Sequence, residues 1–156
     1  MTADLPSGTP APARLGSRFL ARVIDTVVLV AIDWLLAAAL AGPTSPDDFS
    51  YADQVLLSAL VFVLYFAYEG AMTSARGQTL GKMVLGIRVV LLDGGAVPAG
   101  RPAWTRAAVY ALPGVLLVVL IGPLYWLLDS LWCAWDRPNR QCLHDKAAGT
   151  VVVAAG

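Results

Sequence analysis

The feature that most constrains this chain is a long apolar run that carries charged side chains where it begins. Arg18, Arg22 and Asp25 stand at its start. The run continues apolar to about Ala41, long enough for a helix to cross a bilayer, and Asp33 alone interrupts it. Residues three, four and seven apart share one helical face, and Asp33 returns close to that face three turns after Arg22. Charged groups at membrane depth usually face protein or water, so we expect the rest of the chain to cover this stripe.

The composition also indicates a membrane protein. Hydrophobic residues make up 58% of the 156 residues and charged residues 14%, whereas soluble domains are about 45–50% apolar and about 25% charged. The mean hydropathy is +0.67. Eleven basic side chains balance eleven acidic ones, so the net charge gives no reason to expect nucleic-acid binding.

Two more apolar runs follow the first, at about residues 51–72 and 103–135. The third is longer than one span of about 20 residues, and Pro113 and Gly122-Pro123 interrupt it. It forms either one long kinked helix or two shorter helices that fold back at Gly122-Pro123. We favour the helical hairpin, and predict an all-α multi-pass membrane protein.

The distribution of charge predicts the topology. The N-terminal segment, residues 73–106 and the C-terminal segment are rich in Lys and Arg, whereas residues 42–53 carry acids and no basic side chain. Basic loops stay in the cytoplasm, so we expect both termini to be cytoplasmic in a plasma (inner) membrane. The leading run is too long for a secretory signal and contains two aspartates, which favours a retained span. The Pro- and Ala-rich residues 1–13 predict a disordered tail.

Two β-branched runs predict a short cytoplasmic strand pair. Residues 87–92 are rich in Val, Ile and Leu and precede the turn sequence Asp93-Gly94-Gly95, and residues 149–153 form a second such run. Two strands can pair only on the same side of a membrane, which is why this pairing favours the hairpin.

The remaining polar residues give weak signals for chemistry. Cys133, Cys142 and His144 lack the spacing of a zinc site, so we expect unpaired thiols, no metal and no cofactor. Asp145 could orient His144 as a pH sensor, or cap a helix end. Glu69, close to the far end of the second apolar run, is expected at headgroup level, with a buried functional carboxylate as the alternative. The chain offers no nucleophile with a base and an orienting group, so we do not expect an enzyme.

Three blocks of the chain resemble the RDD family, which is named for one arginine and two aspartates. They are residues 18–25, the central residues 77–94 with Gly77-Gln78-Thr79-Leu80-Gly81-Lys82 and Gly86-Ile87-Arg88, and residues 143–153 with Leu143-His144-Asp145-Lys146. The resemblance covers about residues 14–153 and implies that residues 14–156 form one transmembrane domain.

The resemblance also implies site residues. The family arginine corresponds to Arg22 or Arg18, the first aspartate to Asp25, and the second to Asp145 or Asp129. The family is of unknown molecular function, with a suggested role in transport of unidentified ligands and a link of some members to sodium/proton exchange. Asp33 has no counterpart in the family pattern.

Two functions from different classes remain open. In the preferred one, a small transporter or cation/proton exchanger component binds its ion at Asp25, with Arg22 as a gating partner and Asp33 as a further candidate. In the alternative, Arg22 and Asp25 form a permanent ion pair in a membrane scaffold or assembly partner. The expected partners are the lipid bilayer and a second copy or another membrane protein, since so few helices would need an oligomer to form a conduction path.

Overall fold

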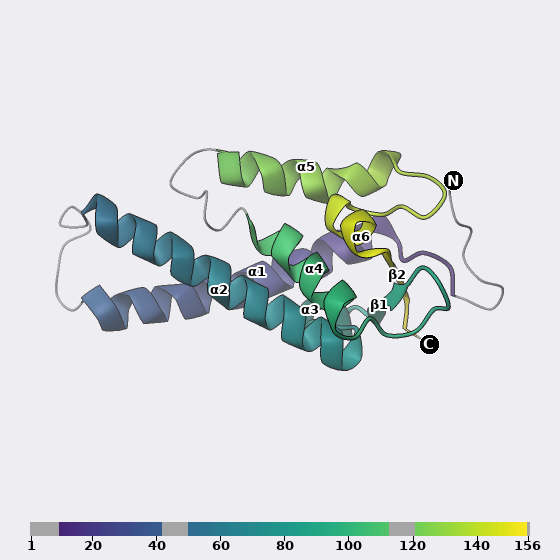
Figure 1. Cartoon of the computed structure of the whole chain (residues 1–156), viewed down its shortest axis with the longest axis horizontal. Helices are drawn as coiled ribbons and strands as arrows, with labels where there is room; N and C mark the ends of the chain where they lie inside the picture. Colours follow the sequence, from purple (N-terminus) through teal and green to yellow (C-terminus); the bar gives the residue numbers. More distant parts are fainter. Residues whose placement is uncertain (1–9, 42–49, 113–120, 156) are drawn as a thin grey trace.

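The computed structural model describes residues 10–41, 50–112 and 121–155, and it is mostly helical (Figure 1). Two long helices lie beside each other, and shorter helices and a strand pair gather around one end of α1 (Figure 1). In chain order the elements are α1 (Leu15–Ala41), α2 (Tyr51–Arg76), α3 (Leu80–Val84), β1 (Ile87–Leu91), α4 (Arg101–Ala111), α5 (Ile121–Trp135), α6 (Leu143–Ala148) and β2 (Thr150–Ala154).

The ends of α2 are defined by local chemistry. Ser50 and Asp53 form a capping box, in which each side chain accepts a hydrogen bond from the backbone of the other. The helix stops at Gly77, whose φ of 67° is left-handed and whose N–H donates to the Thr73 carbonyl. The helix therefore ends four residues beyond the predicted apolar run, and this turn leads the chain into α3.

The predicted strand pair is confirmed. β1 and β2 are antiparallel, with Val89 opposite Val152, and their valines are buried. Residues 1–9 of the predicted tail lie outside the described residues. Ala13, however, is buried, and its N–H donates to the Val152 carbonyl at 2.9 Å. The chain before α1 therefore lies along β2.

The third apolar run forms two helices, α4 and α5, that run in opposite directions (Figure 1). Tyr125 and Trp126 of α5 donate hydrogen bonds to the carbonyls of Val109 and Tyr110 at the end of α4, both at 3.1 Å. The predicted fold-back point is wrong, because Gly122-Pro123 lies in the first turn of α5, where a proline is tolerated. Pro113 lies outside the described residues.

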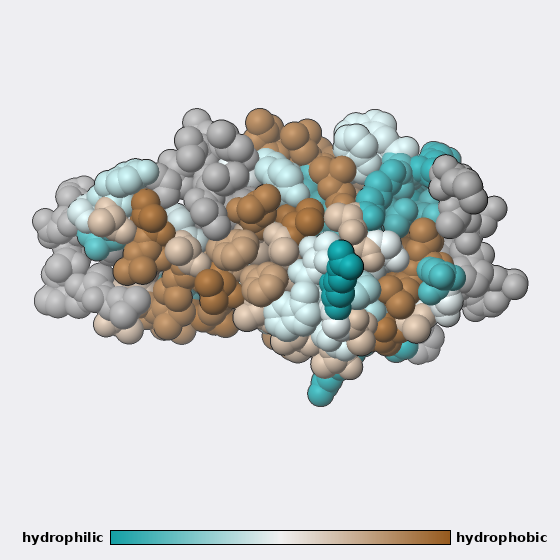
Figure 2. All heavy atoms as spheres, in the orientation of Figure 1, coloured by the Kyte–Doolittle hydropathy of each residue, from teal (hydrophilic) through white to brown (hydrophobic). Residues whose placement is uncertain are grey.

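Many large apolar side chains are exposed on the helices. Figure 2 shows hydrophobic surface over α2 and α5, and strongly hydrophilic surface toward the end that holds α6 and the strands. In the described ranges, α2 is the one helix long and apolar enough to cross a membrane, judged by length and composition. That the chain crosses the membrane several times therefore stays a prediction. The exposed apolar side chains include Phe19, Val23, Val27, Val30 and Trp34 on α1, Val55, Leu56 and Val63 on α2, and Leu124, Leu127, Leu128, Leu131 and Trp135 on α5.

One close contact fixes α1 against α3. A Cβ added to Gly81 would lie 2.1 Å from the carbonyl oxygen of Ala21, so only glycine fits. Ala21 itself is buried. The small residues let the two backbones approach, and this brings the N-terminus of α3 to the polar stripe of α1.

Candidate functional site

Charged and polar side chains from α1 to α6, the helices of the described ranges, meet in one buried cluster, which we call the polar core. Its hydrogen bonds and ion pairs form one continuous network, and most of its members are almost fully buried. The polar core consists of Arg22, Asp25, Tyr68, Glu69, Thr79, Lys82, Arg106, Asp129, His144 and Asp145.

Asp25 is covered by α2 and α3. The residue is only 3% exposed. Its carboxylate accepts hydrogen bonds from the Tyr68 hydroxyl at 2.7 Å, the Thr79 hydroxyl at 2.5 Å and the Gly81 N–H at 2.8 Å. The expectation that neighbouring segments shield Asp25 is confirmed. The predicted Arg22–Asp25 ion pair is absent from the described part of the chain, where neutral donors satisfy Asp25 instead.

Arg22 points to a different set of partners. Its guanidinium carbon lies 3.5 Å from the centre of the Tyr110 ring, a cation–π geometry, and its Nη2 lies 3.4 Å from His144 Nε2. Arg18, one turn earlier, donates to the backbone carbonyls of Val152, at 2.7 Å, and Arg140. The two arginines therefore tie α1 to α4, α6 and β2.

Glu69 is the acidic centre of the network, so the structure agrees with the buried alternative for this carboxylate rather than with an exposed one. The residue is 1% exposed, and its carboxylate pairs with Lys82 at 3.3 Å and with Arg106. Lys82 also donates to Thr79 at 3.1 Å, which connects this ion pair to Asp25. Burial lowers the pKa of Lys82 to about 8, although Glu69 acts in the opposite direction.

His144 is oriented by Asp129 of α5. Of the two roles considered for Asp145, orienting His144 is therefore wrong. Its Nδ1 lies 2.6 Å from an Asp129 oxygen, and its Nε2 lies 2.9 Å from Nη2 of Arg106. Because a guanidinium can only donate, Nε2 must accept, so the proton lies on Nδ1. Burial, followed by the Arg106 charge, lowers the pKa of His144, which keeps the imidazole neutral.

Asp145 combines the capping role predicted for it with an ion pair. One oxygen accepts from the Cys142 N–H at 3.2 Å at the start of α6, and the other accepts from Arg106 Nε at 3.1 Å. Burial acts against the charged form, but the Arg106 charge outweighs it and lowers the pKa of the Asp145 carboxyl. Asp145 is therefore a fixed anion that holds Arg106.

Asp33 is not part of the polar core. It is partly exposed on α1, and its buried Oδ1 has no hydrogen-bond partner within the described ranges. Eight residues separate it from Asp25, about 12 Å along a helix. Asp33 therefore lies on the predicted helix, α1, but too far along it to join the polar core.

A cavity of about 330 Å³ opens onto the polar core between α1, α5 and α6. Its polar lining includes Arg18, Arg22, Lys82 and Arg106, with Asp145 as the carboxylate among the lining residues. Apolar side chains make up much of the remaining wall, including Leu15, Phe19, Ile87, Leu131 and Val152. The cavity thus combines basic groups with an apolar wall.

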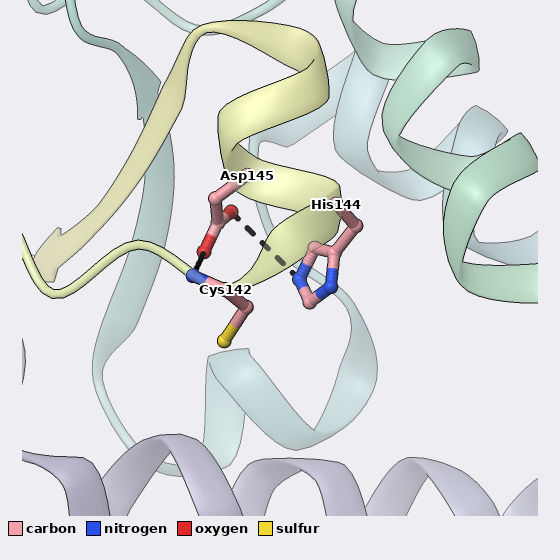
Figure 3. Close-up of side chains that lie close together, drawn as sticks. All are labelled: Cys142, His144 and Asp145. Atoms are coloured by element: carbon pink, nitrogen blue, oxygen red, sulfur yellow. Dashed lines mark hydrogen bonds and ion pairs between the residues drawn. The ribbon is translucent and has the colours of Figure 1, made fainter. Parts of the chain in front are cut away.

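The structure brings together three groups that could in principle bind a metal. One ligand atom each of Cys142, His144 and Asp145 lies within 4.8 Å of the others, and Figure 3 shows the three side chains around the first turn of α6. However, Arg106 donates to both His144 Nε2 and Asp145 Oδ1. A cation at this position would face the guanidinium, so the geometry does not favour a metal site.

Comparison with known proteins agrees with the three sequence blocks that meet in the polar core. The family model described as "RDD family" matches residues 12–149. The chain belongs to the RDD family.

The chain is also similar to two proteins of Bacillus subtilis (strain 168). "Uncharacterized protein YckC" is 29% identical over 148 residues, which cover 91% of this chain and 82% of the relative. "Uncharacterized membrane protein YteJ" is 28% identical over 153 residues, which cover 93% of this chain and 82% of the relative. No solved structure matches the chain.

In this RDD protein, the structure brings together the candidates that the sequence resemblance assigns to the family's arginine and aspartates. Arg22 and Asp25 enter from α1, Asp145 from α6 and Asp129 from α5. Arg18 lies at the edge of the same cavity.

Sequence reasoning did not include five members of the polar core among its site residues, namely Tyr68, Glu69, Thr79, Lys82 and Arg106. The two basic residues were counted only as loop charges that mark the cytoplasmic side. A usable signal existed for Arg106, because Ala103, Ala107 and Tyr110 lie three, one and four residues away and share its buried face. Glu69 is the chain's one glutamate and sits inside an apolar run, which was the corresponding signal on α2.

Proposed function

We propose that this RDD protein is an integral membrane protein and a small transporter or exchanger component, with the polar core as its ligand site. The membrane assignment is supported by the name of YteJ, by the apolarity of α2 and by the exposed apolar side chains of α1 and α5. A multi-pass arrangement in the plasma membrane, with both termini cytoplasmic, is part of the same proposal.

The observation that carries the transport proposal is the cavity's contact with the buried network. A ligand in the cavity would meet Arg22, Arg106 and His144 directly, because all three line it. Buried ionisable groups in membrane proteins commonly mark substrate, ion or proton pathways. A purely structural network would have no need of a cavity that opens onto it.

The geometry suggests how ligand binding and protonation are coupled. Nε2 of neutral His144 accepts from Arg106 and lies near Arg22. An anion that draws a guanidinium away from His144 would leave Nε2 free to accept a proton. Proton uptake would thereby follow anion binding, with Asp129 stabilising the resulting imidazolium.

Asp25 is less suited to the cation-binding role expected from the sequence. Three donors already occupy its oxygens, and basic groups line the cavity. We therefore assign Asp25 to holding α2 and α3 against α1. The apolar surfaces of α1 and α5 are suited to contact lipid or a second copy, and an oligomer would supply the helices that one copy lacks for a conduction path.

The test is flux through the purified protein in liposomes. A pH-sensitive dye inside the vesicles reports proton movement when sodium, potassium or phosphate gradients are imposed one at a time. We expect a signal with the wild-type protein and loss of the signal with His144→Gln. Asp93→Asn is the control, since Asp93 is exposed in a turn. If wild-type vesicles give no proton movement under any gradient, the transport proposal is wrong.

The second candidate is a membrane scaffold or assembly partner, and one observation favours it. Each carboxylate of the polar core has firm partners on other helices, as expected for a network that fixes helix packing. Absence of flux, together with loss of a co-purifying membrane protein from the folded fraction of Glu69→Gln, would support the scaffold. Flux that His144→Gln abolishes without loss of folded protein would exclude it.

A further inference from the structure

Arg18 and Arg22 differ from the other basic groups of the cavity in having no acidic partner among the residues that the structure describes. Lys82 and Arg106 pair with Glu69, and Arg106 also pairs with Asp145. Within residues 10–41, 50–112 and 121–155, neither Arg18 nor Arg22 forms an ion pair with a carboxylate. Carbonyl oxygens hold Arg18, and a ring face and an imidazole hold Arg22.

Each of these arginines also keeps a buried donor without a partner. Nε of Arg18 and Nη1 of Arg22 are shielded from solvent and have no hydrogen-bond acceptor in the described structure. Both residues line the cavity and stand one helical turn apart on α1. A buried donor left unpaired costs free energy, so these groups are arranged to receive an acceptor.

We propose that this cavity binds a phosphate-bearing anion, held by Arg18 and Arg22. Two adjacent guanidinium groups match the several oxygens of a phosphate, which can accept from both in the charge-assisted manner typical of such sites. The inference deepens the proposed function and rests on it only for the location of the ligand site.

The wall of the cavity favours the phosphate of an anionic phospholipid over free phosphate. Leu15, Phe19 and Leu131 line it, and Phe19 and Leu131 are 67% and 43% exposed. An acyl chain could lie along these residues while its headgroup contacts the arginines. Basic pockets between membrane helices bind anionic headgroups in this manner.

The experiment measures ligand-induced thermal stabilisation of the purified full chain in detergent. Four additions are compared, namely phosphatidylglycerol, cardiolipin, zwitterionic phosphatidylcholine and inorganic phosphate. We expect the anionic lipids to raise Tm and to remain bound in native mass spectrometry. Stabilisation by inorganic phosphate to the same extent would support the phosphate site with a soluble ligand. Stabilisation by none of the additions, or equally by phosphatidylcholine, would overturn the proposal.

Two variants test the location. Arg18→Gln with Arg22→Gln should weaken apparent lipid affinity about tenfold or more, as expected for loss of charge-assisted hydrogen bonds. Gly16→Phe keeps both arginines and adds a large side chain at the wall of the cavity, because Gly16 lines it and a Cβ there would meet no atom within 4 Å. It should weaken binding as well.

Arg101→Gln is the matched control, since Arg101 is exposed at the start of α4 and does not line the cavity. Unchanged affinity in Gly16→Phe, or an equal loss in Arg101→Gln, would contradict the assigned site. Lipid or phosphate binding without ion flux would support this inference and refute the transport proposal. Ion flux without phosphate or lipid binding would support transport and refute this inference.

Discussion

Asp129 and His144 are joined by two hydrogen bonds, one to the backbone and one to the ring. The Asp129 carboxylate accepts the His144 N–H at 3.0 Å and the Nδ1–H at 2.6 Å. The first bond fixes the start of α6 against α5, and the second fixes the tautomer. Because the tautomer directs the lone pair of Nε2 at Arg106, Asp129 determines how the imidazole takes part in the polar core.

Replacing Asp129 by Asn should destabilise the protein. The carboxylate accepts two hydrogen bonds from His144, one on each oxygen, whereas an amide has only one oxygen that accepts. If His144 changed tautomer to suit the amide, its Nε2–H would point at Arg106. A buried donor left unsatisfied costs about 1–3 kcal/mol. We expect Asp129→Asn to lower Tm in detergent, measured by nanoscale fluorimetry. Asp93→Asn should leave Tm unchanged, and an equal Tm for the two variants would refute the role given to Asp129.

Glu69→Gln should be more damaging, because two buried cations depend on that carboxylate. Lys82 and Arg106 would remain in the core with no anion between them. Loss of one member of a buried ion pair costs about 3–5 kcal/mol. We expect a low yield of folded protein in size-exclusion chromatography and partial recovery in Glu69→Gln with Lys82→Met. A double variant no more stable than the single one would argue against this pairing.

The sequence predicted the local structure better than it predicted the polar core. The strand at Ile87–Leu91 follows from its β-branched run and the glycine turn after it, and both signals are local. The shielding of Asp25 follows from the cost of exposing a carboxylate to lipid. Neither inference requires knowledge of which helices are neighbours.

The partners of the charged residues could not be predicted in the same way. A helical stripe shows that Arg22 and Asp25 share a face, but not that Tyr110 and Thr79 approach that face from other helices. The sequence pattern around Glu69, near the end of an apolar run, is the same whether the carboxylate faces lipid headgroups or a buried cation. Counting Arg106 as a loop charge concealed its inward direction. Each of these outcomes is decided by long-range packing.

Gly81→Ala tests the close contact between α1 and α3. The added methyl would overlap the Ala21 carbonyl, and backbone on both sides leaves little room to adjust. Overpacking of this kind costs about 1–3 kcal/mol, and here it would also move the N–H that donates to Asp25. We expect a lower Tm. Gly16→Ala is the control, because its Cβ meets nothing. It should be neutral or stabilising, and the reverse order would refute this contact.

The single histidine allows a direct test of the neutral imidazole by NMR. Chemical shifts of ¹⁵N-histidine in the purified protein should show a neutral ring protonated on Nδ1 at pH 7, since His144 is the one histidine of the chain. Burial lowers its pKa in the folded state, so a fall in pH protonates the unfolded chain first, near pH 6.5.

Stability should therefore be retained above about pH 6.5 and should decrease as the pH falls from there toward the lower folded-state pKa. In His144→Gln, which does not titrate, the Tm difference from wild type should shrink as the pH is lowered from 7 to 5. An imidazolium signal at pH 7, or a Tm difference that does not change with pH, would show that Arg106 does not face a neutral Nε2.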